Sequence, residues 1–162
     1  MMGSADPGKN WWVQTMSEIE SESYSIRTFR YPDDYEQVYA LWQSAGPGIH
    51  AGRSDTPEEI EKKIQRDPEL FLVAELKGRI VGTVLGGFDG RRGMVYHLAV
   101  EADQRKNGIG DRLMVELEQR LKEKGCIRSY LLVTYDNQEA VRFYEKRGWT
   151  RMELFTYGKD IR

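Results

Sequence analysis

Cysteine, histidine and long apolar runs are scarce in this sequence of 162 residues. The single cysteine, Cys126, cannot form an intrachain disulfide, which agrees with a reducing compartment. Two histidines and one cysteine do not show the ligand spacing that zinc requires, so we expect no metal. No apolar run reaches the roughly 18 residues of a membrane span, and no signal-peptide pattern opens the chain. We therefore expect a cytoplasmic protein without a membrane partner.

An excess of charge of one sign is also lacking. The chain has 24 Lys and Arg against 26 Asp and Glu, a net charge of −2, and the signs are mixed locally. Proteins that bind nucleic acid through bulk electrostatics carry a basic excess, so we expect no nucleic-acid partner. The content of 40% hydrophobic and 31% charged residues is typical of a globular domain, and the length suffices for one substantial core.

The domain organisation follows from where regular patterning begins. Residues 1–23 show no sustained period and are interpreted as an amino-terminal extension or expression remnant. Residues 24–162 show no internal repeat and no linker, which indicates a single domain.

Apolar spacing and turn residues predict an alternating order of strands and helices. The predicted elements are a strand at 26–31, helices at 33–45 and 57–66, strands at 71–76, 80–85 and 94–100, a helix at 108–124, a strand at 127–134, a helix from 137 to before 148, and a strand at 149–157. A strand, a helix and a second strand form a crossover, so the strands at 94–100 and 127–134 should run parallel. The apolar run at 131–133 predicts burial on both faces.

A glycine-bearing turn joins the strand at 94–100 to the long helix. The start of a helix leaves N–H groups without partners and is electropositive, and Gly108 and Gly110 keep side chains away from it, so the turn could receive phosphate. A Walker loop would need G-K-[S/T], and a dinucleotide fingerprint would need a small residue in place of Leu113. The plain alternative is that both glycines merely shape a turn into an ordinary helix.

Two motifs carry a resemblance to a known family. The run Gln104-Arg105-Lys106-Asn107-Gly108-Ile109-Gly110 resembles the Q/R-x-x-G-x-G/A signature of the GNAT superfamily of acyl-CoA-dependent N-acetyltransferases. Residues 137–149, NQEAVRFYEKRGW, are similar to that family's N-x-x-A-x-x-(F/L)-Y-x-x-x-G-(F/W) segment. The predicted element order also matches from Ser25 onward. Among subfamilies, the chain looks most like small bacterial acetyltransferases allied to those that acetylate ribosomal-protein amino termini.

The resemblance implies an α/β fold and a co-substrate. The mixed central sheet would have six or seven strands flanked by four helices, with the fourth and fifth strands parallel and splayed. Acetyl-CoA would bind with its pyrophosphate on the backbone N–H groups of residues 105–111 and its pantetheine arm along residues 98–100. The implied binding residues are Leu98, Ala99, Val100, Arg105, Lys106, Asn107, Gly108, Ile109, Gly110, Asp111, Asn137 and Tyr144.

Catalytic roles follow in part. The resemblance places Tyr144 near the thioester sulfur, where its hydroxyl would act as general acid to the departing thiolate; the plain alternative is a core aromatic that pairs with Phe143. The base stays open among His97, Glu101, Glu75, Tyr96 and Asp136. Strand alternation puts Tyr96 on the face of Leu98 and Val100 and His97 on the other, unless a bulge intervenes. Tyr96 is therefore the predicted acceptor-side catalytic residue, and His97 is predicted to be structural.

The predicted function is transfer of an acetyl group from acetyl-CoA to a primary amine of a small molecule, peptide or protein. The alternative is a non-catalytic acyl-CoA-binding sensor or interaction module, and a nucleotide-phosphate binder is a third reading. Acceptor specificity is assigned to the loop between the first two helices, which contains His50 and Arg53. Only one strand fits after Gly148, so a short exposed edge agrees with either a monomer or a homodimer.

Overall fold

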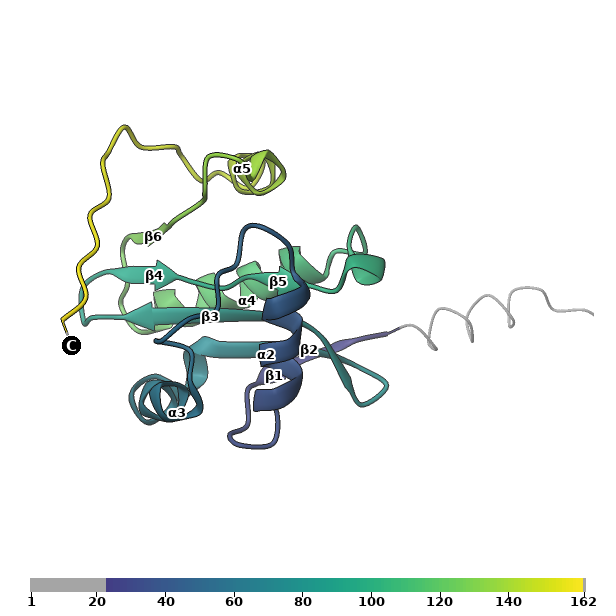
Figure 1. The fold of residues 1–162 in the computed structure, drawn as a ribbon. Helices are drawn as coiled ribbons and strands as arrows, with labels where there is room; N and C mark the ends of the chain where they lie inside the picture. The colour runs from purple at the N-terminus through teal and green to yellow at the C-terminus, as the bar shows by residue number, and fades with distance from the viewer. Residues whose placement is uncertain (1–22, 162) are drawn as a thin grey trace, which may run out of the picture.

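The computed structural model describes residues 23–161, so nearly all of the predicted extension at 1–23 lies outside the described residues. Six strands form one mixed sheet in the order β1-β2-β3-β4-β6, and β5 pairs with β3 (Figure 1). The elements are β1 Ser25–Thr28, α2 Tyr35–Ser44, α3 Pro57–Arg66, η1 Pro68–Leu70, β2 Phe71–Leu76, β3 Arg79–Phe88, β4 Gly93–Val95, β5 Ala99–Val100, η2 Ala102–Gln104, α4 Ile109–Glu123, β6 Ser129–Leu131 and α5 Gln138–Glu145. The predicted α/β fold is confirmed, including the parallel pairing of β4 with β6.

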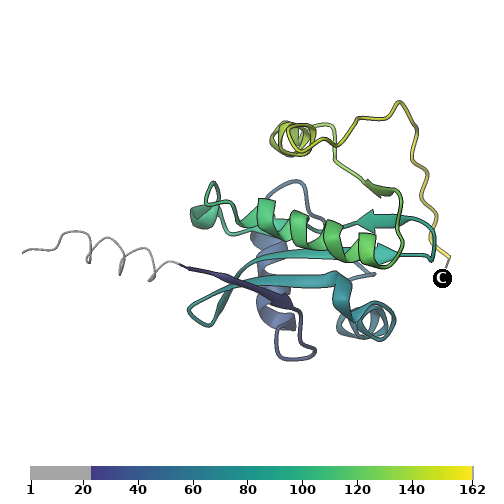
Figure 2. The same ribbon diagram turned by 180° about the vertical axis from the view of Figure 1, so that it is seen from behind.

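Helices cover both faces of the sheet, and each face has its own core. Trp42 of α2 and Ile60 of α3 pack with Phe71 on one face. Leu113 and Leu117 of α4 pack with other strand residues on the opposite face, which Figure 2 shows from the α4 side. Burial of these apolar side chains is the main source of stability, since each large one removed from water contributes about 2 kcal/mol.

The long helix α4 confirms the prediction of a helix at 108–124 to within one residue at each end. Its predicted apolar stripe is buried: Ile109, Leu113, Leu117 and Leu121 are all at most 3% exposed. The helix lies unusually close to β3, because a Cβ on Gly86 would stand only 2.5 Å from Leu117 Cδ1. The position of α4 is therefore fixed by packing along its whole length.

Two predictions near the carboxyl end are wrong. β6 comprises only Ser129–Leu131, not residues 127–134, and Leu132 is 64% exposed, not buried on both faces. The predicted strand at 149–157 does not form; residues 149–161 run outside the sheet (Figure 1). β6 is thus an edge strand in the described chain, and Leu132 lies just beyond its last paired residue.

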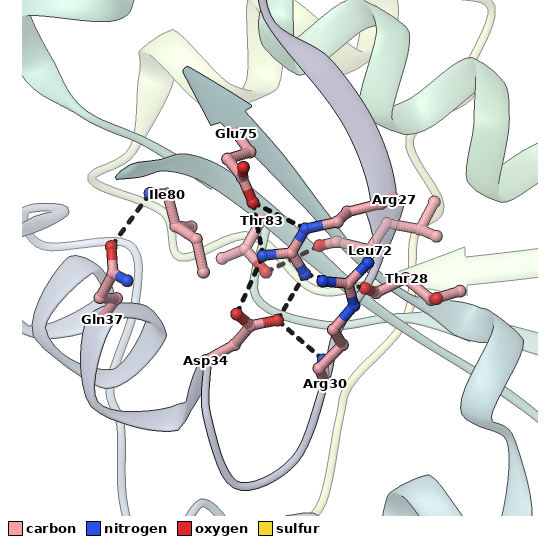
Figure 3. A network of polar contacts seen from close by, with 9 residues as sticks. All are labelled: Arg27, Thr28, Arg30, Asp34, Gln37, Leu72, Glu75, Ile80 and Thr83. Carbon is pink, nitrogen blue, oxygen red and sulfur yellow. Dashed lines mark hydrogen bonds and ion pairs between the residues drawn. The ribbon is translucent and has the colours of Figure 1, made fainter. Parts of the chain in front are cut away.

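A half-buried arginine, Arg27, ties β1, β2 and the start of α2 together (Figure 3). The Arg27 guanidinium donates to both carboxylate oxygens of Asp34, at 2.6 and 3.0 Å, and its Nε donates to Glu75 at 2.7 Å. The backbone N–H of Arg30 also donates to Asp34, at 2.7 Å. Burial raises the pKa of Asp34, but these hydrogen bonds outweigh burial and hold its pKa below the usual value.

Replacing Arg27 by methionine is expected to lower the free energy of unfolding by about 3 kcal/mol, because the Asp34 carboxylate, 7% exposed, would lose its partner. The Arg79→Met variant is the control, since Arg79 is 54% exposed in its ion pair with Glu101 and should cost less than about 1 kcal/mol. Because the folded pKa of Asp34 is lowered, the stabilisation should be complete above about pH 5 and be lost as pH falls further. Urea unfolding at several pH values measures both effects; equal losses in the two variants would contradict the assignment.

Candidate active site

The turn before α4 leaves backbone donors exposed at the helix start. Gly108 occupies the N-cap position in the left-handed conformation, with φ of 77°, and no side chain caps the helix. The first helical hydrogen bond runs from Arg112 N–H to the Gly108 carbonyl, at 3.1 Å. The N–H groups of residues 109–111 therefore point out of the helix end without an intrahelical partner, an arrangement that suits an anion.

Arg105 lies in this turn, and its side chain donates hydrogen bonds to two backbone carbonyls of the protein itself. Its Nε donates to the Val100 carbonyl and its Nη2 donates to the Ala45 carbonyl, both at 3.1 Å. The guanidinium thus links the turn to β5 and to the end of α2. Lys106 is exposed and adopts a positive φ of 67°, so the backbone of the turn is bent on both sides of Asn107.

The sheet opens next to this helix start. β4 and β6 pair in parallel from Gly93 with Ser129 to Val95 with Leu131, and the ladder stops there. Beyond Val95, the chain continues as β5, which pairs only with β3, while the chain beyond Leu131 leads to α5. In Figure 1, β5 and α5 lie on the two sides of this divergence. The predicted splaying of the two parallel strands is confirmed.

A β-bulge separates β4 from β5. Val95 pairs with Gly86 and Ala99 pairs with Thr83. The chain therefore advances by four residues from Val95 to Ala99, while β3 advances by only three between their partners. The extra residue lies at 96–98 and shifts the alternation of side chains. The continuous strand predicted at 94–100 is therefore interrupted.

The bulge overturns the argument that favoured Tyr96 over His97. Leu98 and Val100 pack against the α4 core. His97 instead contacts Trp42 in the opposite core, with ring centroids 4.8 Å apart. The Tyr96 ring lies over Gly87 close to Lys63 Nζ of α3, on this same side. Tyr96 and His97 thus share the α2–α3 face, and the predicted placement of Tyr96 with Leu98 and Val100 is wrong.

α5 carries the other two predicted residues. Asn137 caps this helix by accepting a hydrogen bond from Ala140 N–H at 3.1 Å, and its amide packs so closely on Gly48 that a Cβ there would lie 2.1 Å from Asn137 Nδ2. Tyr144 makes edge contacts with the rings of Phe143 and Trp149. Burial raises the pKa of Tyr144 to about 12, although Arg147 acts weakly in the opposite direction. The Tyr144 hydroxyl therefore stays protonated at neutral pH. It has no hydrogen-bond partner among residues 23–161, so it is free to donate to a ligand.

α5 is held against the start of α4 by two contacts that the sequence did not reveal. Arg147 forms an ion pair with Asp111 in the first turn of α4 and donates to the Phe143 carbonyl. A Cβ on Gly110 would lie 3.3 Å from the Phe143 ring, so Gly110 permits the close approach of the two helices. These contacts place the Tyr144 helix beside the uncapped helix end.

Asp55 is a further residue that sequence reasoning did not single out. Its carboxylate lies 3.0 Å from His97 Nε2 although the two residues are 42 positions apart. In the sequence Asp55 stands within a helix-start pattern, just before Thr56, which accepts a hydrogen bond from Glu59 N–H as the cap of α3. Because the helix-start pattern already explains an aspartate at this position, the sequence gives no sign of a second role for Asp55. Its contact with the bulge forms only in the folded chain.

Within residues 23–161, no cluster of three or more His, Cys, Asp or Glu side chains could hold a metal ion. No helix in that range combines the length and the apolar character needed to cross a bilayer.

Known proteins resemble this chain in sequence and in structure. An acetyltransferase of Pectobacterium atrosepticum is 42% identical over 136 residues, which cover 84% of this chain and 94% of that protein. Ard1 from Thermoplasma volcanium superposes with a TM-score of 0.69 at 30% identity, over 78% of this chain and 82% of that one. The PaiA N-acetyltransferase from Thermoplasma acidophilum, solved in complex with coenzyme A, has a TM-score of 0.71 over 82% of this chain and 93% of that one; at 20% identity it shows the fold alone.

The family assignment rests on the greater part of the chain. Residues 14–149 match the sequence profile of the acetyltransferase (GNAT) family, a range that includes the turn before α4, the bulge and α5. The resemblance inferred from the two motifs is thereby confirmed. This chain belongs to the acetyltransferase (GNAT) family.

Proposed function

We propose that this protein transfers the acetyl group of acetyl-CoA to a primary amine of a small molecule, a peptide or a protein. The observation that carries the proposal is the juxtaposition of the uncapped start of α4 with the point where β4 and β6 diverge. A helix start can hold a diphosphate, and a gap between parallel strands offers unpaired backbone groups to an extended arm. One ligand with both parts is an acyl-CoA, which agrees with the family.

The donor would lie along the inner edge of β5 and across the turn. The backbone N–H groups of residues 105–111 would bind the pyrophosphate. Since the Arg105 guanidinium is already bonded to two carbonyls, its role in the proposal is to fix the turn, and Lys106 would add charge from the side. Leu98, Ala99 and Val100 would hold the pantetheine arm and acetyl group, with Asn137 on the opposite wall.

The chemistry would be direct attack of the amine on the thioester. The tetrahedral oxyanion is stabilised by an aligned backbone N–H of the strand, and the departing thiolate is stabilised by the Tyr144 hydroxyl acting as general acid. The acceptor would approach over the α2–α3 face, where Tyr96 is 50% exposed. The loop between α2 and α3 borders this face, because its Asp55 contacts His97.

Ligand-dependent melting tests the donor. Acetyl-CoA at about 100 times its Kd should raise the free energy of unfolding by about 2.7 kcal/mol, whereas ATP and NAD should have little effect. An equal or larger shift with a nucleotide alone would favour a nucleotide-phosphate binder.

A panel of amines and peptides, followed by release of free thiol from acetyl-CoA, tests the enzyme. Turnover with a primary amine is the expected result. Binding of acetyl-CoA without thiol release from any acceptor would favour the non-catalytic acyl-CoA-binding module. Sedimentation of the same samples would tell a monomer from a homodimer.

A further inference from the structure

The bulge at 96–98 places a histidine beside a buried carboxylate on the face proposed for the acceptor. His97 Nε2 lies 3.0 Å from Asp55 Oδ1, and the Asp55 side chain is only 6% exposed. The other carboxylate oxygen accepts a hydrogen bond from Gly52 N–H at 2.8 Å. The Tyr35 hydroxyl donates to the Asp55 carbonyl at 2.9 Å, so both ends of Asp55 are fixed. The carboxylate is therefore held in place before any ligand binds.

The charge of Asp55 determines which ring nitrogen of His97 carries the proton. Burial raises the pKa of Asp55, but the hydrogen bonds from His97 and Gly52 outweigh burial and keep the pKa below its usual value. An ionised carboxylate can only accept, so Nε2 of the neutral imidazole must be the donor. The lone pair of the ring then lies on Nδ1, and Asp55 fixes this tautomer and the ring orientation.

The ring is also held from the side and remains accessible. Trp42, itself fully buried, packs edge-on against the imidazole with an interplanar angle of 63°. The His97 side chain is 20% exposed, which leaves it open to a water or a substrate. His97 directly precedes Leu98, the first strand residue assigned to the acetyl group. A base at this position is one residue away from the proposed point of attack.

We infer that His97 is the base that deprotonates the acceptor amine and that Asp55 is its positioning residue, an inference that rests on the proposed function. The acceptor ammonium gives one proton to His97 Nδ1, directly or through one water. The freed lone pair forms a C–N bond to the thioester carbonyl carbon, the C–S bond breaks, and Tyr144 gives its proton to the thiolate. The attacking nitrogen, which still carries one proton more than the amide product, passes that proton through water to the Tyr144 phenolate oxygen. The imidazolium then releases its proton to solvent.

Other ionisable groups near His97 come from each neighbouring element. Asp55 on the loop before α3 contacts His97 directly, and Tyr35 on α2 contacts Asp55. Tyr96 is the neighbour of His97 in the chain, and Lys63 of α3 lies beside Tyr96 over Gly87. The pKa of Asp55 lies below its usual value of about 4 and burial raises the pKa of Tyr35 above about 10. Burial also lowers the pKa of Lys63, whose Nζ is paired with Asp67 at 2.6 Å. Loss of a proton from Lys63 would therefore affect the alkaline limb of the pH profile of activity. An acidic limb of activity that His97→Gln abolishes would therefore report the imidazole.

The His97→Gln variant separates catalysis from structure, because the Gln amide can still donate to Asp55 from the position of Nε2 but offers no basic nitrogen. With the acceptor found in the amine panel, we expect a fall in kcat of about 100-fold or more, an unchanged melting temperature and loss of the acidic limb. The Asp55→Asn variant should lower kcat while the KM for acetyl-CoA stays near the wild-type value. If His97→Gln has a lower melting temperature than the wild type, His97→Ala provides the second measurement. Added imidazole should raise the turnover of His97→Ala at least tenfold.

Failure of the His97 inference can be told apart from failure of the proposed function. A wild-type protein without turnover on any amine would refute the proposed function together with this inference. Wild-type turnover that His97→Gln retains, with the same acidic limb, would refute only the inference and leave the Asp55–His97 pair as a structural link between the loop and the bulge. Absence of imidazole rescue in His97→Ala, where His97→Gln has unfolded, would also overturn it.

Discussion

Replacing Tyr144 by phenylalanine is expected to lower kcat about 100-fold, while the KM for acetyl-CoA changes by less than about threefold. The substitution removes one hydroxyl and keeps the ring, so the edge contacts with Phe143 and Trp149 persist. Since the hydroxyl has no partner among residues 23–161, the free energy of unfolding should change by less than about 1 kcal/mol. Steady-state kinetics together with a melting curve would test both statements.

The raised pKa of Tyr144, about 12, sharpens the prediction. A thiol titrates near about 8.5, so the phenol is the weaker acid: it donates a hydrogen bond to the departing thiolate and gives up its proton only as the proton of the attacking nitrogen replaces it. Loss of the Tyr144 proton should therefore contribute no alkaline limb below about pH 11. The matched control is Tyr157→Phe, because Tyr157 is 90% exposed and should show wild-type kinetics. Full turnover by Tyr144→Phe would show that the proton-donor role is wrong.

Replacing Gly108 by alanine is expected to raise the KM for acetyl-CoA at least about tenfold, equivalent to about 1.4 kcal/mol of binding. Gly108 has a φ of 77°, a conformation that costs an L-residue about 1–2 kcal/mol. The turn can relieve that strain only by rotating, which would turn the N–H groups of residues 109–111 away from the direction that suits a diphosphate. Isothermal calorimetry with acetyl-CoA measures the loss directly.

The same helix offers a control for the backbone strain. Gly125, just beyond the end of α4, has a φ of 86°, and an added Cβ would meet no atom within 4 Å at either glycine. Gly125→Ala should therefore lose about the same stability, roughly 1–2 kcal/mol, with no change in acetyl-CoA binding. Equal losses of binding in both variants would mean that α4 responds as a whole and that its start is not the pyrophosphate site.

Patterns local to one element were read correctly from the sequence. The hairpin of β2 and β3 forms as predicted, and its turn residues Lys77 and Gly78 both have positive φ, as a two-residue connection between twisted strands requires. The apolar stripe of α4 is buried as its spacing predicted. Such features depend on residues within a few positions of one another, and the chain carries that information directly.

Errors arose where a structure depends on two distant segments. Strand alternation assigned Tyr96 to the face of Leu98, but a bulge is a mismatch between two strands, and neither strand shows it alone. The run Leu131-Leu132-Val133 looks doubly buried, yet β6 is an edge because nothing pairs beyond it in the described chain. The hydrogen bonds of the Arg105 side chain also join distant segments, since its acceptors on Val100 and Ala45 come from different elements.

The sequence by itself determined the family, the uncapped helix start at Gly108 and the position of Tyr144 in a motif, because each depends on residue types at fixed short spacing. Only the tertiary structure decided which side chains lie on the α2–α3 face, where we propose that the acceptor binds. It joined Asp55 to His97 across 42 positions and turned Tyr96 toward the same face. The physical reason is that the proposed donor site consists of backbone groups of one local turn, whereas the face proposed for the acceptor is assembled from a loop, a helix and a bulge that meet only after folding.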